Sequence, residues 1–216
     1  MLLGPFILPW GSAPQWDMII GMAPDEILGA TAARSGHFLF ESGHHSDLWL
    51  DLELLCLRPR QLHGAVTALA EKIRGLGVDA VCGPLNEGAF VALMVASVLD
   101  VDFTYAERFD EKGAGGLFPV LYRLPRTLHS RVIGKRVAIV NDVVSAGSAV
   151  RGTHMDLLAA GAAPVAIAAL LVLGDAAAQF AAANGMRLIS LDQRPLRIWT
   201  PAECPLCATG VPLEEA

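Results

Sequence analysis

The segment from Val137 to Val150 constrains the fold of this chain more than any other part of the sequence. Its first four residues, Val137 to Val140, are apolar and form a run typical of a short, fully buried strand. Asn141 and Asp142 follow this run, and Ser145-Ala-Gly-Ser148 then leads into a stretch with helical apolar periodicity. The pattern predicts a buried strand, a turn of small residues and a helix, which together are a building unit of an α/β fold.

The predicted turn has the chemistry of a phosphate-binding loop. Backbone N–H groups at a helix N-terminus, the helix dipole and the hydroxyls of Ser145 and Ser148 all favour a dianion. Gly147 allows the backbone to approach a ligand closely, and the Asp142 carboxylate can accept hydrogen bonds from vicinal sugar hydroxyls. The alternative is an ordinary strand–loop–helix connection capped by Ser148. The combined pattern favours a ligand site.

This segment resembles the motif that binds phosphoribosyl pyrophosphate (PRPP) in type I phosphoribosyltransferases, and its Ser-Ala-Gly-Ser-Ala form is most similar to orotate phosphoribosyltransferases. The resemblance implies that Asn141 and Asp142 hold the ribose hydroxyls. It implies that the 5′-phosphate is held by the turn residues Ser145, Ala146, Gly147 and Ser148. Asn141 stands where the family usually has an acid. Because charge-assisted hydrogen bonds contribute about 1.5–3 kcal/mol and neutral ones about 0.5–1.5 kcal/mol, we expect weakened ribose binding.

A second loop follows the buried strand expected at 78–82, and it is expected at the same edge of the sheet. The resemblance places Gly83, Pro84 and Gly88 of this loop against the pyrophosphate, through backbone groups. Asn86 and Glu87 stand where orotate enzymes commonly have a lysine.

Residues 107–116 form a long, charged, Gly-rich stretch, as expected of a lid over an active site. In the resembled family this loop brings cations onto the departing pyrophosphate, and Arg108 and Lys112 are the candidates here. Residues 112–140 contain six cations and no acid, which indicates a local anion site in an acidic chain. The alternative is a solvated basic hairpin.

The N-terminal part predicts a small hood. Residues 37–41 and 47–53 alternate apolar and polar side chains, as half-exposed strands do. The pair resembles the hood hairpin that leans over the base in orotate phosphoribosyltransferases, and this resemblance implies that His44, His45 and Trp49 face the base. The alternative is that Trp49 belongs to the core and the histidines form a solvated turn.

The segment Cys204-Pro-Leu-Cys207 resembles the C-terminal extension of one subgroup of orotate phosphoribosyltransferases. The spacing of Cys204 and Cys207 makes them candidate zinc ligands, but two cysteines are half of a zinc site. Completing it would require a partner chain or distant histidines. A structural turn with two free thiols is therefore the favoured interpretation.

Composition narrows the class of protein. The 216 residues fit one medium domain with appendages. Although 53% of the residues are hydrophobic, no apolar run reaches the ~20 residues of a membrane-spanning helix, so we expect no membrane association. The net charge of −6 argues against nucleic-acid binding. The four cysteines show no disulfide framework, which favours the cytoplasm.

These features predict an α/β fold of the type I phosphoribosyltransferase kind, with a mainly parallel central sheet flanked by helices and a small N-terminal hood. We expect an apolar N-terminal arm at 1–23, the main domain at 24–198 with the hood at about 24–56, and a C-terminal extension at 199–216. A first helix is expected from Pro24 to Gly36. Further helices are expected at 58–74, 89–99, 148–160 and 175–183, and core strands at 78–82, 101–106, 137–140, 164–173 and 186–190.

The resemblance implies the reaction of orotate with PRPP to give orotidine 5′-monophosphate and pyrophosphate, a step of pyrimidine nucleotide biosynthesis. It also implies Mg²⁺ as cofactor, a homodimer, and mainly electrostatic catalysis by Asp142, Arg108 and Lys112. Two alternatives stay open: a non-catalytic regulator that binds PRPP or a nucleotide, and a transferase for another base. The regulator is supported by Glu87 in the pyrophosphate loop, by the acidic lid, and by Leu173-Gly-Asp175, which lacks the arginine that orotate enzymes tend to show there. In the other transferase, His44, His45 and Trp49 would shape the pocket.

Overall fold

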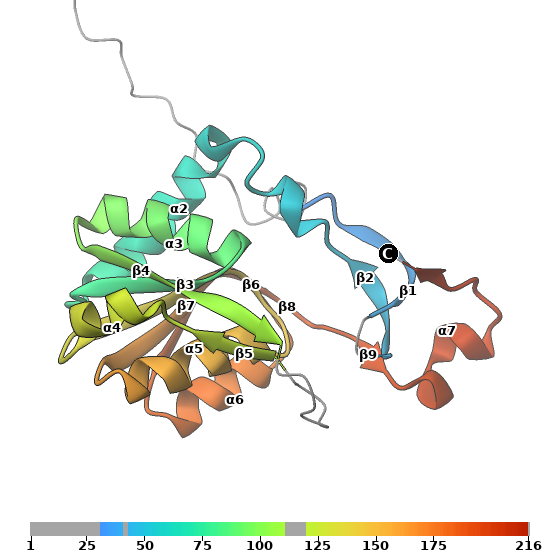
Figure 1. Ribbon diagram of the computed structural model, residues 1–216. Helices are drawn as coiled ribbons and strands as arrows, with labels where there is room; N and C mark the ends of the chain where they lie inside the picture. The colour runs from blue at the N-terminus through green and yellow to red at the C-terminus, as the bar shows by residue number, and fades with distance from the viewer. Residues whose placement is uncertain (1–30, 41–42, 111–119, 216) are drawn as a thin grey trace, which may run out of the picture.

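The computed structural model describes residues 31–40, 43–110 and 120–215, and within them the core is a six-stranded sheet ordered β5-β4-β3-β6-β7-β8 (Figure 1). Its strands are β3 (Ala80–Pro84), β4 (Asp102–Asp110), β5 (Val120–Arg123), β6 (Arg136–Val144), β7 (Ala163–Leu173) and β8 (Arg187–Arg194). Neighbouring strands are parallel except for β4 and β5, which are antiparallel. The predicted α/β fold with a mainly parallel sheet is confirmed.

Helices cover both faces of this sheet and give three layers (Figure 1). On one face lie α2 (Pro59–Arg74) and α3 (Glu87–Leu99), and on the other lie α4 (Arg126–Val132), α5 (Ser148–Ala159) and α6 (Ala176–Ala183). Side chains of a strand alternate between faces. Ala138 and Val140 of β6 therefore join the apolar cluster under α2 and α3, whereas Val137 and Ile139 join the cluster under α5. This double burial explains the uninterrupted apolar run of the sequence.

A second, four-stranded sheet is ordered β10-β1-β2-β9. Its strands are β1 (Arg34–Leu39), β2 (His45–Trp49), β9 (Ile198–Trp199) and β10 (Glu214–Glu215). The short helices η2 (Pro201–Glu203) and α7 (Pro205–Ala208) connect β9 to β10, and η1 (Leu52–Leu54) follows β2. The hood and the C-terminal extension are thus one structural unit. In Figure 1 it lies to the right of the core, on the side where β4 ends.

Two predicted boundaries are wrong. The expected first helix cannot reach Gly36, because β1 already begins at Arg34. The expected lid cannot begin at Glu107, because β4 continues to Asp110. In addition, β5 and α4 are not predicted, because residues 120–135 show no periodic pattern in the sequence.

The longer β4 has a simple cause. It pairs with β5, so that Glu107 lies opposite Arg123, and opposite charges across two strands stabilise such a pair.

Lys112, the second candidate of the lid, lies outside the described residues, as does the N-terminal arm at 1–23. Among the helices of the described ranges, none has the length and apolar character needed to cross a membrane.

Candidate ribose-phosphate site

The turn between β6 and α5 is built as the sequence predicts. β6 ends at Val144, α5 begins at Ser148, and Gly147 is the residue that precedes the helix. Gly147 has a φ of +80°, in the left-handed region where a side chain costs about 1–2 kcal/mol. Ser148 is the first helical residue and not the cap, and no side chain caps this helix. The first N–H groups of α5 are therefore left for a ligand.

A cavity of about 250 Å³ opens at this turn. Its lining consists of the turn, the start of α5, Asn141 and Val143 of β6, and Arg108 and Tyr122 from β4 and β5. Helix N–H groups facing an arginine form an arrangement that suits a phosphorylated ligand. The structure thus places Arg108 in the lining of the cavity at the predicted phosphate turn. Its contact with pyrophosphate stays a prediction.

Packing of the β4–β5 hairpin against α5 explains how Arg108 reaches this cavity. Arg108 and Tyr122 are directly opposite each other in the hairpin. Tyr122 lies against Gly152 of α5, where an added Cβ would be only 3.0 Å from the Tyr122 nitrogen. Gly152 therefore sets the approach of the hairpin to the helix, and Tyr122 is a lining residue that sequence reasoning missed.

A larger hollow of about 480 Å³ lies elsewhere, between β4, β5 and the start of α4. Two of its polar side chains, Asp156 and His129, already have partners there. Asp156 accepts a hydrogen bond of 2.7 Å from the Leu124 N–H and lies 3.5 Å from His129 Nε2. We place the functional site in the smaller cavity, because the predicted phosphate turn, the uncapped start of α5 and Asn141 all line it.

Asp142 follows the lining residue Asn141 in β6 and carries a buried atom without a partner in the described part of the chain, although it is not itself part of the cavity lining. Its side chain is 4% exposed, and its Oδ2 atom has no hydrogen-bond partner among the described residues. The pKa of Asp142 is raised to about 6, mainly by burial and to a smaller extent by the charges of Glu87 and Glu53, against backbone hydrogen bonds that lower it. A buried carboxylate oxygen without a partner destabilises the fold, and such groups cluster at functional sites.

Asn141 is fixed by its backbone and by α3. Its side-chain amide donates a 2.8 Å hydrogen bond to the Val143 carbonyl. Its Oδ1 atom lies so close to Gly88 that a Cβ added there would be 1.9 Å away. An aspartate could not donate the bond to Val143. The departure from the family's acid at this position is therefore supported by the local structure.

The expected loop at 83–88 is much shorter than predicted. Gly83 and Pro84 complete β3, Gly88 lies in the first turn of α3, and only Leu85 and Asn86 connect the two elements. An added Cβ at Gly83 would be 2.7 Å from backbone atoms of α3. Gly83 is thus needed for close packing of α3 on β3. The backbone contacts to pyrophosphate expected of Gly83, Pro84 and Gly88 stay a prediction.

The three residues of the hood that were expected to face the base, His44, His45 and Trp49, have different surroundings in the structure. Trp49 packs against Phe38 and Phe40, with ring centroids 6.1 and 5.9 Å away, and its indole N–H donates to Asp51. This matches the alternative in which Trp49 is a packing residue. His44 lies half-buried at the turn, and its contact with a base stays a prediction.

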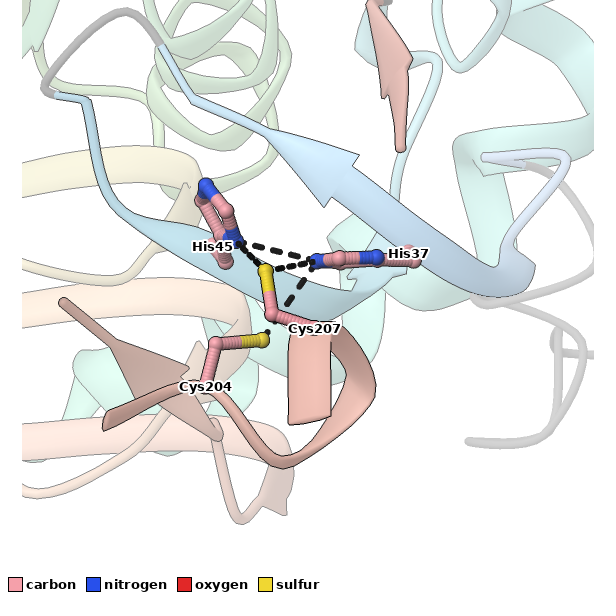
Figure 2. A group of neighbouring side chains, drawn as sticks. All are labelled: His37, His45, Cys204 and Cys207. Atoms are coloured by element: carbon pink, nitrogen blue, oxygen red, sulfur yellow. Dashed lines mark hydrogen bonds between the residues drawn. The ribbon is translucent and has the colours of Figure 1, made fainter. Parts of the chain in front are cut away.

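His45 has a different environment from the one expected. Its ring is buried and lies beside His37, Cys204 and Cys207 (Figure 2). The expectation that His45 faces the base is corrected, because its Nδ1 atom points into this group. Cys204 and Cys207 are free cysteines, as the favoured interpretation expects. The structure adds that His37 and His45 lie within reach of both. Sequence reasoning did not single out His37.

Comparison with known proteins identifies the class. Residues 59–189 match the family model of the phosphoribosyl transferase domain, so the chain belongs to this family. The chain is 33% identical over 201 residues to the orotate phosphoribosyltransferase of Heliobacterium modesticaldum, which covers 88% of this chain and 96% of the relative. It is 30% identical over 178 residues to the orotate phosphoribosyltransferase of Caldanaerobacter subterraneus, covering 82% and 86% respectively.

A solved structure supports the same fold. The orotate phosphoribosyltransferase from Aeropyrum pernix superposes with a TM-score of 0.63 at 24% identity, covering 79% of this chain and 92% of that one. The fold and the family predicted from the β6–α5 segment are confirmed.

Proposed function

We propose that this protein is an orotate phosphoribosyltransferase, which converts orotate and PRPP into orotidine 5′-monophosphate and pyrophosphate. The observation that carries the proposal is Asp142, a buried carboxylate with an oxygen that lacks a partner, beside a turn that offers the N–H groups of a helix N-terminus. A ribose 5′-phosphate would supply hydroxyls that donate to the Asp142 oxygen and a phosphate that accepts from the helix N–H groups. The curated relatives named above carry the same activity in their names.

In this proposal each group has a defined task. Asp142 accepts hydrogen bonds from the ribose hydroxyls, and the Oδ1 atom of Asn141 accepts one more. The turn at 145–148 binds the 5′-phosphate, and Arg108 contacts the phosphates from across the cavity. Charge develops on the leaving pyrophosphate in the transition state, so fixed dipoles and cations lower the barrier without a covalent nucleophile.

The residues around Asp142 fit a divalent cation that enters with PRPP. Mg²⁺ prefers oxygen ligands. The free oxygen of Asp142 and the carboxylates of Glu87 and Glu53, which act on it electrostatically, supply such atoms. Mg²⁺ would neutralise charge on the pyrophosphate. We also propose a homodimer in the cytoplasm, with the chain divided into the arm, the main domain and the C-terminal extension described above.

The carboxyl edge of the sheet does hold an arginine, although not where orotate enzymes tend to have it. Arg194 of β8 is directly opposite Leu173 of β7, and its Nε atom is 2.7 Å from Asp192 Oδ2. We propose that this Asp-Arg pair replaces the one absent after Leu173 and that Arg194 meets the orotate carboxylate.

Arg194→Gln is expected to raise the KM for orotate about 10-fold or more, because a charge-assisted hydrogen bond contributes about 1.5–3 kcal/mol. The KM for PRPP should change little. Steady-state kinetics with each substrate varied in turn measures both values. Arg187→Gln, at the opposite end of the same strand, is the control and should leave both constants unchanged. Equal effects of the two variants would refute the assignment.

Gly147→Ala is expected to lower both stability and PRPP affinity. The left-handed φ costs about 1–2 kcal/mol once a Cβ is present, and relief of this strain would move the turn that binds phosphate. Gly185 also has a positive φ, 65°, with open space around it. Gly185→Ala should therefore lose similar stability in chemical denaturation but keep its PRPP affinity in calorimetry. If both variants bind PRPP equally, Gly147 has no role beyond its backbone conformation.

The activity itself is tested by single-turnover loss of orotate absorbance with PRPP and Mg²⁺, together with calorimetry of PRPP alone. Turnover is the expected result. PRPP binding without turnover would instead support a non-catalytic regulator, an alternative favoured by Glu87, whose charge acts on Asp142. Turnover with another base but not with orotate would support the third interpretation.

A further inference from the structure

The four side chains of His37, His45, Cys204 and Cys207 converge on one point, although they come from opposite ends of the sequence (Figure 2). One potential ligand atom from each residue lies within 4.8 Å of all the others. Three of the four residues are buried: His37 is 1% exposed, His45 is 5% exposed and Cys204 is 3% exposed. Two imidazoles and two thiols form the side-chain set of a structural zinc site.

Four of the six distances within this group are close to those around a tetrahedral ion, and the other two are no longer than 4.8 Å. With zinc bonds of about 2.0–2.1 Å to nitrogen and about 2.3 Å to sulfur, tetrahedral geometry puts neighbouring ligand atoms about 3.4–3.8 Å apart. The His37 Nε2 atom lies 3.4 Å from Cys204 Sγ and 3.7 Å from Cys207 Sγ. Cys207 Sγ lies 3.3 Å from His45 Nδ1, and the two nitrogens are 2.9 Å apart. Shifts of about half an ångström or less would bring these pairs to the geometry of a zinc ion.

Hydrogen bonding alone does not account for this arrangement. His37 Nδ1 lies 2.8 Å from the Val211 carbonyl, and because a carbonyl only accepts, this nitrogen must carry the proton. A neutral His37 then has a single lone pair, on Nε2. His45 Nδ1, Cys204 Sγ and Cys207 Sγ all approach that one nitrogen. One lone pair cannot satisfy three donors, whereas a cation bound to all four atoms satisfies every one of them.

The Val211 carbonyl also completes the surroundings expected of a metal-binding histidine. Such a histidine usually donates its second ring N–H to a carbonyl or carboxylate, which fixes the tautomer and the ring orientation. Val211 follows α7 in the same C-terminal segment as the two cysteines. The segment thus supplies two candidate ligands and the group that orients a third.

Backbone geometry explains how the two histidines meet. In the β1–β2 pair, Leu39 lies opposite His45, and the register shifts between Ser35 and Phe38. His37 lies in this irregular stretch of β1. An irregularity of this kind re-aims a side chain, and His37 shares the face of Leu39 and His45 because side chains alternate along a strand.

We propose that His37 Nε2, His45 Nδ1, Cys204 Sγ and Cys207 Sγ bind one Zn²⁺ in a closed, structural site that fastens the C-terminal extension to the hood. Tetrahedral coordination by two sulfurs and two nitrogens selects zinc among the common divalent ions. The C-terminal extension needs such an attachment, because β9 and β10 each contribute only two residues to the small sheet. This inference does not depend on the proposed orotate activity.

Elemental analysis of the full chain, purified without chelator, is the first test. We expect about one zinc per chain. After removal of zinc by a strong chelator, titration with Co²⁺ should give the absorption bands of tetrahedral cobalt and a thiolate-to-cobalt charge-transfer band. Metal removal should also lower the midpoint of thermal unfolding and increase hydrogen exchange across residues 198–215, while exchange in the core strands stays unchanged.

Matched variants locate the ligands. Cys204→Ser, Cys207→Ser, His37→Gln and His45→Gln should each lose zinc, whereas Cys56→Ser and His44→Gln, which change the same residue types outside the group, should keep it. Circular dichroism identifies variants that fail to fold, and these are set aside without affecting the measurement on the unmodified chain. The proposal is overturned by an unmodified protein that holds no zinc and binds no Co²⁺, by a Cys204–Cys207 disulfide in the freshly purified chain, or by iron in place of zinc.

Discussion

Asp142→Asn should lose about 100-fold or more in kcat/KM for PRPP, while the folded protein becomes more stable at neutral pH. The loss of activity follows from the charge, because charge-assisted hydrogen bonds to two ribose hydroxyls contribute about 1.5–3 kcal/mol each. The shape of the side chain is conserved, so the cavity at the β6–α5 turn should persist. Steady-state kinetics and PRPP calorimetry measure the loss.

The gain in stability follows from the raised pKa of Asp142, which is about 6 in the folded protein against an ordinary value of 3.8. As the pH rises, the unfolded chain releases this proton first, so ionisation favours unfolding. The penalty is absent below about pH 4, grows between pH 4 and 6, and is complete above pH 6. Two pKa units correspond to about 3 kcal/mol, which is the upper limit for the gain in the variant at pH 7.5.

Denaturant titrations at pH 7.5 and at lower pH check this dependence, since the advantage of Asp142→Asn should shrink toward pH 4. Asp102→Asn is the matched control. Asp102 lies exposed at the start of β4, far from the carboxyl edge, and pairs with Lys135, whose proximity lowers the pKa of Asp102. Its substitution should leave activity unchanged and bring no gain in stability. A destabilised but active Asp142→Asn protein would contradict both halves of the prediction.

Gly88→Ala should lose most PRPP-dependent activity through a single methyl group. The new Cβ would lie 1.9 Å from Asn141 Oδ1, so Asn141 must rotate and break its hydrogen bond to the Val143 carbonyl. Overpacking of this kind costs about 1–3 kcal/mol of stability. Because Asn141 lines the cavity, we expect the KM for PRPP to rise about 10-fold or more, by loss of positioned contacts.

Gly75→Ala is the control for this substitution. Gly75 ends α2 with a φ of −68°, and an added Cβ there would meet nothing within 4 Å. Alanine is compatible with that conformation, so the variant should be unchanged or more stable by about 0.4–1 kcal/mol. A crystal structure of Gly88→Ala with Asn141 in its original position, together with normal kinetics, would remove Asn141 from the ribose site.

The β6–α5 unit could be predicted because its signals are local. An apolar run, an acidic residue and a turn of small residues lie within one short segment, and their order dictates strand, turn and helix. Asp142 and the phosphate turn follow directly from that order. The sequence shows that Asn141 replaces the family's acid. Its hydrogen bond to Val143, however, depends on backbone geometry that no sequence pattern reveals.

Other features depend on contacts between distant segments. Arg108 belongs to a strand and not to a lid, because pairing with β5 extends β4. The partners of Cys204 and Cys207 lie more than 150 positions away in the sequence. Of the adjacent histidines His44 and His45, only His45, the first residue of β2, lies with the cysteines. Sequence reasoning named both and could not choose between them.

The strand order β10-β1-β2-β9 also sets the order in which the molecule can assemble. β1 and β2 leave the ribosome early, yet their edges are covered by strands made after the whole core sheet. Contacts between segments so far apart in sequence form slowly, because the intervening chain must first be brought together. We therefore expect the core to fold first and the small sheet to close last. During synthesis the β1–β2 hairpin would wait with two open edges, and a nascent chain at this stage is most exposed to aggregation.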